Sequence, residues 1–315
     1  MNTIQALIDE IERIYQRNAL NVNSDNSFVN GGTATIPDFI LDAGVNLPNL
    51  ADSQPIAFEA DIKSVLLTGA TGFLGSHILK QLLDSTDAII YCLVRANTVK
   101  QAQQRVKQAA QSYRLAIDLH RIVPILGDME QPQLGLSKKN WAMLCKQVQH
   151  IVHTASYVNH IQPYFAFKKS VSGTNELLTI ASTHTLKMIH FVSSTTVSTQ
   201  VNNSHFSINP IEDFIDVDDA ALICSGYGQS KWVQEENIRQ ASLTGVPYTI
   251  YRFSEISGSS ATGIGNTDDI FHRILRMMLS VPARDDAASY LIDVIPVDKA
   301  AQSIVFGMND TQKRN

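Results

Sequence analysis

Apolar residues follow two different periods along the middle of the chain. Apolar runs of strand length recur at 62–68, 88–94, 121–126, 150–155, 187–193 and 247–253. The intervening stretches, at about 74–84, 98–116, 137–147, 162–183 and 227–243, place apolar residues at helical spacing. Nearly continuous apolar strands that alternate with helices indicate a parallel sheet buried on both faces. The pattern therefore predicts an α/β fold with a doubly wound parallel sheet, in which ligands bind beyond the carboxyl ends of the strands.

The two ends of the chain have other patterns. Residues 3–17 are spaced as an amphipathic helix, and residues 21–60 are polar and interrupted by Gly and Pro. We therefore predict an N-terminal helix and linker over 1–60, with the helix either a packing element or the remnant of a neighbouring domain. A nucleotide-binding domain is expected over 61–255, with an insertion at about 199–225, and a substrate-binding subdomain begins at 256–315.

Composition narrows the classes of partner. The 315 residues carry a net charge of -5 and a pI near 6.0, which argues against nucleic acid or an anionic membrane as the main partner. No apolar run is long enough to span a membrane, and the N-terminus lacks the pattern of a signal peptide. The cysteines and histidines have neither disulfide nor zinc spacing. We expect a cytoplasmic protein without a metal.

A glycine-rich loop follows the first predicted strand. In "TGATGFLGSHILKQLL" the glycines Gly69, Gly72 and Gly75 lie between a strand and a helix. They permit a tight turn, close approach of the backbone to a pyrophosphate, and close contact of helix with strand, respectively. The helix then offers its free N–H groups to the phosphates. This pattern predicts a dinucleotide site, and its candidate contacts in the loop are Thr68, Gly69, Thr71, Gly72, Phe73, Leu74 and Gly75.

The residues after the next two strands concern the choice of dinucleotide. Arg95 stands where an acidic residue would bind the ribose 2′-hydroxyl of NAD, so a 2′-phosphate and hence NADPH is favoured. Arg105 is either a second phosphate contact or a solvated helix residue. Asp128 is either an acceptor for the adenine amino group or an ordinary turn residue, and Met129 beside it is a further candidate contact.

Two Tyr and Lys pairs have the four-residue spacing that places side chains on one helix face. They are Tyr227 with Lys231, and Tyr164 with Lys168. A lysine one helical turn away can lower the pKa of a tyrosine from about 10 toward 7, which suits a proton donor beside a carbonyl. Only Tyr227 has a hydroxyl at a neighbouring strand end, that of Ser194 in "FVSSTTV". We therefore interpret Tyr227 and Lys231 as the catalytic pair, and Tyr164 as the start of a helix that packs against the sheet.

These residues together resemble the extended short-chain dehydrogenase/reductase superfamily. More closely, the chain resembles the thioester reductase domains that end nonribosomal peptide and polyketide assembly lines and occur in carboxylic acid reductases. The similarity runs from about residue 62 to 310 and is carried by "LLTGATGFLGSHIL", "YCLVRA", "ILGDMEQPQLGLS", "IVHTASYVNHIQPY", "GYGQSKWVQEE" and "ISGSSATGIGNTDD".

The resemblance implies roles for individual residues. Ser194 would be the hydroxyl donor, Tyr227 the proton donor, and Lys231 the partner of Tyr227 that also holds the nicotinamide ribose. Asn159 matches an Asn near the substrate channel. In two places the chain departs from the family: Ser170 replaces an Asn, and residues 253–255 replace a Pro-Gly turn. The family also continues into a longer C-terminal subdomain, so 256–315 is expected to be an incomplete one.

The implied reaction is NADPH-dependent reduction of an acyl or peptidyl thioester on the phosphopantetheine arm of a carrier protein, giving an aldehyde and, with a second hydride, an alcohol. The chain would be a monomeric domain of a larger multidomain enzyme. Fatty acyl-CoA reductase and sugar-nucleotide epimerase or dehydratase are the alternatives within enzymes. A non-catalytic NADP-sensing module is the alternative from another class.

Overall fold

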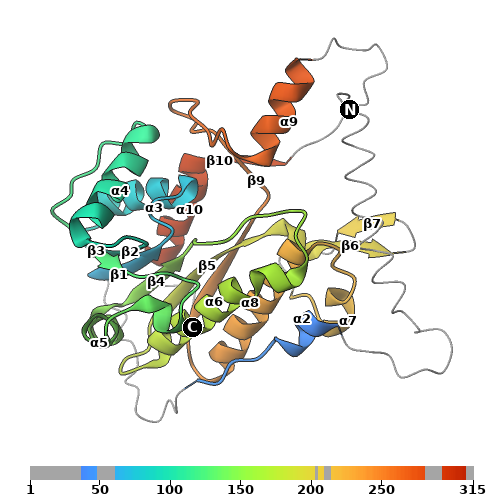
Figure 1. Cartoon of the computed structure of the whole chain (residues 1–315), viewed down its shortest axis with the longest axis horizontal. Helices are drawn as coiled ribbons and strands as arrows, with labels where there is room; N and C mark the ends of the chain where they lie inside the picture. The colour runs from blue at the N-terminus through green and yellow to red at the C-terminus, as the bar shows by residue number, and fades with distance from the viewer. Residues whose placement is uncertain (1–36, 48–60, 203–204, 209–213, 281–292, 310–315) are drawn as a thin grey trace.

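Six parallel strands form the centre of the computed structural model, which describes residues 37–47, 61–202, 205–208, 214–280 and 293–309 (Figure 1). The helix expected at 3–17 lies outside these ranges. The strand order is β3-β2-β1-β4-β5-β8, so the chain reverses direction across the sheet beside β1. Each strand begins and ends close to its predicted position: β1 (Ser64–Thr68), β2 (Ile89–Val94), β3 (Ile122–Leu126), β4 (His150–His153), β5 (Met188–Ser194) and β8 (Tyr248–Phe253).

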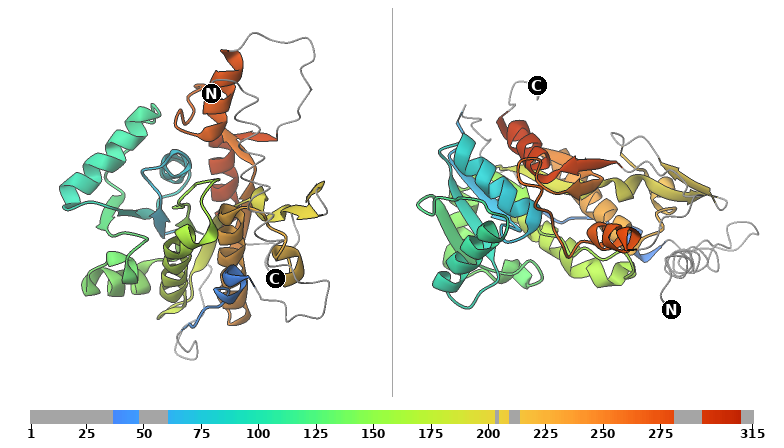
Figure 2. Two further views of the ribbon diagram at one scale, coloured as in Figure 1. Left: turned by 45° about the vertical axis from the view of Figure 1, so that its right-hand side comes forward. Right: turned by 90° about the horizontal axis from the view of Figure 1, so that it is seen from above.

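Helices cover both faces of this sheet, which confirms the predicted doubly wound α/β fold (Figure 2). One face is covered by α3 (Phe73–Ser85), α4 (Val99–Ser112) and α10 (Val297–Asn309). The other is covered by α5 (Lys138–Gln147), α6 (Lys168–Ser182) and α8 (Gly226–Leu243). Because α10 packs against α3, the end of the described chain contributes to the core beside the first βα unit.

Local sequence signals account for where several helices begin and end. The hydroxyls of Thr98, Ser137 and Ser225 accept hydrogen bonds from the N–H groups three residues later and so cap α4, α5 and α8. Helix α4 ends before the predicted position because Arg114 has a φ of 55°, which a continuing helix does not allow. The helix predicted over 162–183 begins later than expected. Its first part is instead a short 3-10 helix, η3 (Tyr164–Phe167), and α6 begins only at Lys168.

The insertion between β5 and α8 contains structure that the hydrophobic pattern does not predict. After the 3-10 turn η4 (Thr195–Ser198), the strands β6 (Thr199–Asn202) and β7 (His205–Ile208) form an antiparallel pair. The short helix α7 (Val217–Ala220) follows. The remaining elements are the 3-10 turn η2 (Pro132–Gly135), helix α9 (Ile270–Leu279), and the parallel pair β9 (Glu255–Ser257) and β10 (Val294–Pro296).

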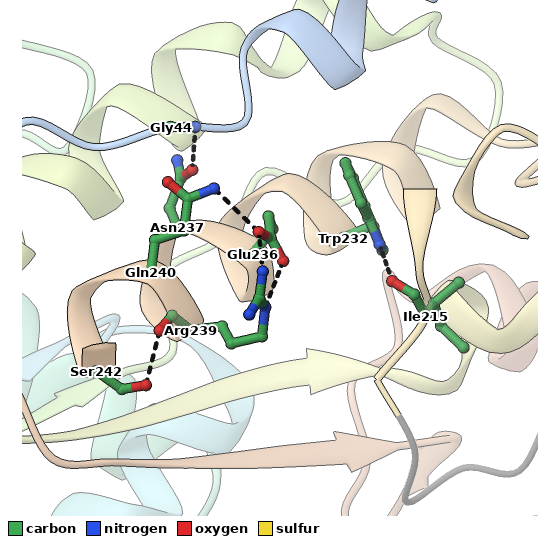
Figure 3. Close-up of polar contacts among 8 residues, drawn as sticks. All are labelled: Gly44, Ile215, Trp232, Glu236, Asn237, Arg239, Gln240 and Ser242. Atoms are coloured by element: carbon green, nitrogen blue, oxygen red, sulfur yellow. Dashed lines mark hydrogen bonds and ion pairs between the residues drawn. The ribbon is translucent and has the colours of Figure 1, made fainter. Parts of the chain in front are cut away.

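Part of the predicted linker is a packed segment on the outer side of α8. It contains α2 (Asp38–Leu41), and the ring of its Phe39 meets Trp232 edge-on, with the centroids 5.7 Å apart. Gly44 donates its N–H to Asn237 at 2.7 Å, and Trp232 donates to the carbonyl of Ile215 at 2.8 Å (Figure 3). Residues 37–47 thus help to fix the helix that carries Tyr227. Among the described residues, no helix is both long and apolar enough to cross a membrane.

Candidate active site

A cleft of about 740 Å³ opens beyond the carboxyl ends of the parallel strands. Its position is the one that a doubly wound sheet predicts for a ligand. Of the residues proposed from the sequence, only Lys231 and Asn159 are absent from its walls. Those that line it are Thr68, Gly69, Thr71, Gly72, Phe73, Leu74, Gly75, Arg95, Arg105, Asp128, Met129, Ser194 and Tyr227.

Two glycines of the loop after β1 have no room for a side chain. Gly69 has a φ of 79°, and a Cβ there would lie 2.4 Å from the hydroxyl of Thr154. A Cβ on Gly75 would lie 2.0 Å from the carbonyl oxygen of Gly69, because the loop closes directly onto α3. The sequence prediction of a tight turn and a close contact of helix with strand is therefore confirmed at these two positions.

The start of α3 has the properties of a phosphate cradle. Its N-cap, Gly72, has no side chain to bond the free N–H groups, and the first turn holds no acidic residue. The first residues of α3 line the cleft, so the positive end of the helix dipole faces it without a neighbouring acidic side chain. The loop and helix fit the pyrophosphate of a dinucleotide.

Charged and polar residues complete the outer wall of this cradle. Arg95 follows β2 directly and is exposed on the cleft, and Arg105 of α4 donates a hydrogen bond to the Arg95 carbonyl. Arg105 is thereby held at the cleft by its contact with the Arg95 backbone. Asp128 follows β3, and one of its carboxylate oxygens accepts from the Glu130 N–H at 3.0 Å. That bond is typical of an aspartate in a turn, and Asp128 also lines the cleft.

Tyr227 and Ser194 face the same cleft from different elements. Tyr227 lies in the first turn of α8 and is 8% exposed, while Ser194 is the last residue of β5. Burial raises the pKa of Tyr227 to about 12, the hydrogen bond with Ser156 opposes the rise, and the carboxylates of Asp269 and Glu255 add to it. The phenol is thus held in its protonated form, which is the form that can donate a proton.

Lys231 lies behind Tyr227 rather than in the wall of the cleft. It is 2% exposed, donates to the Val192 carbonyl at 2.8 Å, and has its Nζ 4.7 Å from the ring centroid of Phe191 and 5.8 Å from that of Tyr227. Burial lowers the pKa of Lys231 to about 7, against the opposing effect of Glu235. The expectation that Lys231 brings the pKa of Tyr227 toward 7 is wrong for this arrangement, because burial dominates both groups and Nζ is directed at a carbonyl.

The competing pair lies elsewhere. The Tyr164 hydroxyl donates to Asp42 at 2.9 Å, and Lys168 forms an ion pair with the same carboxylate at 3.0 Å. Tyr164 is buried against Phe39 of α2, so it packs on this segment and α8 instead of on the sheet as expected. Neither residue lines the cleft.

Asn159 uses its side chain within its own loop. Its carboxamide oxygen accepts from the N–H groups of Ile161 and Gln162, both at 3.0 Å, and its nitrogen donates to the Tyr157 hydroxyl at 3.2 Å. Tyr157 and Val158 line the cleft beside it. The geometry therefore gives Asn159 the task of shaping the loop that carries these two residues.

The chain departs from the family pattern at Ser170 and at residues 253–255, and the structure shows what these residues contact. Ser170 of α6 lines the cleft, and its hydroxyl accepts from the Gln234 amide at 3.2 Å. Phe253 is partly buried and packs beside Tyr251 against the core, with the two rings nearly parallel. Ser254 donates to the Asp293 carbonyl at 2.9 Å, which joins the end of β8 to the start of β10.

Several cleft residues were not predicted from the sequence. Ser156 and His160 lie in the loop after β4, and the His160 ring meets Tyr227 at a centroid distance of 5.5 Å. Glu255 and Asp269 come from β9 and the start of α9. The loop after β4 could have been found, because it follows a parallel strand. Asp269 ends the motif "ISGSSATGIGNTDD", but the periodicity gave no signal of its approach to Tyr227, since that approach depends on the folding of a distant segment.

Glu255 and Asp269 share a side-chain hydrogen bond, which the protonated carboxyl of Glu255 can donate. Burial and the Asp269 charge raise the pKa of Glu255 to about 7 from 4.5. The folded state therefore binds this proton more tightly than the unfolded state, and stability is lost as the pH rises from about 4.5 to 7.

In the described residues, no group of three or more His, Cys, Asp and Glu side chains could hold a metal.

We expect Glu255→Gln to remove that loss of stability. The amide can still bond Asp269 without a second charge, so the melting temperature should exceed that of the wild type by about 2 °C at pH 8 and match it at pH 4. Thermal unfolding at both pH values measures the difference. Asp269→Asn should reproduce the effect, and the double variant should add little to it; an equal shift at both pH values would contradict the shared proton.

Comparison with known proteins agrees with this geometry. The family model described as "Male sterility protein", an NAD-binding family, matches residues 67–304. The chain is 37% identical over 269 residues to a component of the linear gramicidin synthase of Brevibacillus parabrevis, covering 84% of this chain and 5% of that protein. It is 34% identical over 277 residues to a carboxylic acid reductase of Mycobacterium tuberculosis, covering 81% of this chain and 23% of that protein.

A solved structure shares both the sequence and the fold. The terminal R domain from the myxalamid PKS-NRPS pathway is 36% identical, with a TM-score of 0.76 over 85% of this chain and 68% of that one. The chain thus spans a small part of the whole relatives and about two thirds of an R domain. Family, fold and cleft together support an oxidoreductase that uses a nicotinamide cofactor, and the chain belongs to the male sterility family of NAD-binding proteins, among the reductase domains of that family.

Proposed function

We propose that this chain reduces a carrier-bound acyl or peptidyl thioester with NADPH and releases the product as an aldehyde, which a second hydride can reduce further to the alcohol. The observation that carries the proposal is the arrangement of Tyr227 and Ser194 in one cleft with the glycine cradle, in a chain similar to R domains. When bound, NADPH supplies the hydride. The chain itself supplies the cradle, the proton and the hydrogen bonds to the carbonyl oxygen.

The proposed roles follow from the state of each group. Tyr227, whose phenol stays protonated, donates a hydrogen bond and then its proton to the oxygen of the thioester carbonyl. Ser194 donates a second hydrogen bond to the same oxygen and stabilises its developing negative charge. Lys231 fixes the start of α8 through the Val192 carbonyl and presents its charge behind Tyr227. Asn159 would act indirectly, by holding the loop of Tyr157 at the substrate side.

NADPH is proposed over NADH because of the two guanidinium groups. Arg95 and Arg105 both line the cleft, and neither belongs to an ion pair among those found in the described residues. A guanidinium can bind a 2′-phosphate through two parallel hydrogen bonds. An uncharged ribose hydroxyl gains far less from the same group.

Arg95→Ala should therefore weaken NADPH binding by about 10- to 100-fold, the value of one or two hydrogen bonds to a charged group, and leave NADH binding nearly unchanged. Fluorescence titration of both cofactors measures the ratio. Lys100→Ala is the matched control, because Lys100 is exposed nearby on α4 and does not line the cleft. Equal loss of both cofactors in Arg95→Ala would refute the assignment.

The partner follows from the relatives. Relatives of the chain include a nonribosomal peptide synthetase of Aspergillus flavus, so we propose a carrier protein with a phosphopantetheine arm as the donor of the substrate. The chain would act in the cytoplasm as a monomeric domain of a larger enzyme. The division into residues 1–60, 61–255 and 256–315 is part of the same proposal.

The test is an assay that compares substrates of the rival classes. NADPH oxidation is followed with an acyl thioester on a carrier protein, an acyl-CoA and a nucleotide sugar, and the released aldehyde is trapped. We expect aldehyde from the carrier-bound thioester at the highest kcat/KM. Preference for acyl-CoA would favour a fatty acyl-CoA reductase, turnover of the sugar an epimerase or dehydratase, and tight NADPH binding without any turnover a sensing module.

A further inference from the structure

Glu235, one helical turn after Lys231 in α8, forms a buried ion pair with Arg252. The guanidinium of Arg252 in β8 donates to both carboxylate oxygens of Glu235 in α8, at 3.0 and 2.6 Å. The side chains are 7% and 2% exposed, respectively. A pair so deeply buried loses much of the hydration of two charges and is weak evidence for a contribution to stability. Its position relative to the proposed catalytic helix suggests another role.

Three residues of α8 share one face of the helix. Tyr227, Lys231 and Glu235 are four residues apart in turn, so Lys231 has the tyrosine on one side and the carboxylate on the other. Lys231 nonetheless donates to the Val192 carbonyl of β5. In the register between β5 and β8, Arg252 lies opposite Ser193, which is the residue after Val192. The guanidinium thus approaches Glu235 from the sheet, under the same helical turn as Lys231.

Without Arg252, the carboxylate of Glu235 would attract the nearest cation. At low dielectric the attraction between unit charges is many times stronger than in water, and Lys231 is only one turn away. The fork of Arg252 occupies both oxygens of Glu235 and leaves Lys231 to the Val192 carbonyl. The remaining field of the carboxylate still favours the charged form of Lys231.

We propose that Glu235 and Arg252 are positioning residues that together hold the Lys231 ammonium on the Val192 carbonyl beside Tyr227. Arg252 prevents Glu235 from drawing Lys231 down the helix, and Glu235 keeps the buried amine charged. The proposal rests on the proposed function for its catalytic meaning, whereas the electrostatic coupling can be measured without it.

The charged and titratable groups that face Lys231 come from three elements. Glu235 and Tyr227 belong to its own helix, and Arg252 to β8. His153 of β4 is buried between the Thr68 and Thr174 hydroxyls, and burial, with a smaller effect of Lys231, lowers its pKa to about 3. His153 is therefore neutral at working pH, and in the described part of the chain Glu235 is the charged group that opposes the effect of burial on Lys231.

The experiment titrates the Lys231 amine by NMR in protein with labelled lysine, the signal being assigned by its loss in Lys231→Met. The wild-type midpoint should lie near pH 7. Glu235→Gln should lower it by about one unit, and Arg252→Met should raise it by a smaller amount, because Glu235 is the charge that opposes burial at Lys231. Opposite shifts of this kind are not expected from general loosening of the structure.

The matched control is Glu236→Gln, one residue along the same helix. Glu236 bonds Arg239 and Gln240 on the outer side of α8, where Arg239 is partly exposed (Figure 3). Its removal should leave the Lys231 midpoint unchanged. The proposal is overturned if Glu235→Gln and Arg252→Met both leave the midpoint where Glu236→Gln does, or shift it in the same direction.

Either single substitution leaves a buried charge unpaired and can prevent folding. The double variant Glu235→Leu/Arg252→Met then decides, because an apolar pair of similar size is tolerated in such places. Its Lys231 midpoint should fall, and an unchanged midpoint overturns the proposal. In assays of thioester reduction, the pH at which kcat changes should move with the midpoint while KM for the thioester stays constant. Failure of that assay alone counts against the proposed function, not against the coupling.

Discussion

Tyr227→Phe lowers the turnover of thioester reduction by about 10²- to 10⁴-fold, the usual contribution of a positioned general acid, and leaves NADPH affinity unchanged. The expectation follows from the burial of the phenol, which holds its pKa at about 12 and keeps the transferable proton in place. The phenylalanine ring still fills the space against His160 and Phe167. Steady-state kinetics and NADPH titration of the purified variant measure the two quantities.

Tyr164→Phe is the matched control for this substitution. It removes the hydroxyl that donates to Asp42, at a cost of about 1 kcal/mol in stability, and touches no wall of the cleft. Its turnover should equal that of the wild type. A Tyr227→Phe variant that loses turnover and NADPH binding in equal measure would show that Tyr227 is structural, and one that keeps full turnover would remove it from the mechanism.

Gly75→Ala abolishes NADPH binding and lowers the free energy of unfolding by about 3 kcal/mol or more. A Cβ at this position would lie 2.0 Å from the Gly69 carbonyl oxygen and 2.6 Å from its carbon, and both are backbone atoms that no side-chain rotation can move. Either α3 separates from the loop or the loop itself changes shape, and both outcomes disrupt the site that would bind the pyrophosphate. Denaturant unfolding and cofactor titration follow the two effects.

Gly44→Ala provides the comparison for a glycine with free space around it. The nearest atom to a Cβ there is the side-chain oxygen of Gln240 at 4.0 Å, so this variant should unfold and bind NADPH as the wild type does. If Gly75→Ala behaved in the same way, α3 would not be held against the loop as described, and the cradle would have to be placed elsewhere.

Local patterns in the sequence were sufficient for the sheet and the cofactor side of the cleft. The strands are apolar runs and the glycine loop is one continuous segment, so the wall from Thr68 to Gly75 could be predicted without tertiary information. The packing of residues 37–47 on α8, and the approach of Asp269 to Tyr227, join segments that are far apart in the chain. No periodicity reports such contacts, and both were missed.

The pKa of Tyr227 shows a second limit of sequence reasoning. A lysine at i+4 is within reach of a tyrosine, but spacing does not tell where its Nζ points. In the fold, Val192 offers a carbonyl, and desolvation lowers the pKa of Lys231 itself to about 7. Burial is a property of the completed core, so the balance between burial and charge could be assessed only from the structure.

The transfer of a label from the cofactor tests the reduction of a thioester at the Tyr227 cleft most directly. The protein is incubated under single-turnover conditions with NADPH and with a carrier protein that bears an acyl-phosphopantetheine thioester. In this NADPH, the hydrogen that is transferred from the nicotinamide C4 is replaced by deuterium. Mass spectrometry of the trapped product should show an aldehyde with one deuterium on its carbonyl carbon, released with one free thiol. Release of an unlabelled carboxylic acid with the thiol, or a thioester that stays intact while NADPH is bound, would contradict the claim.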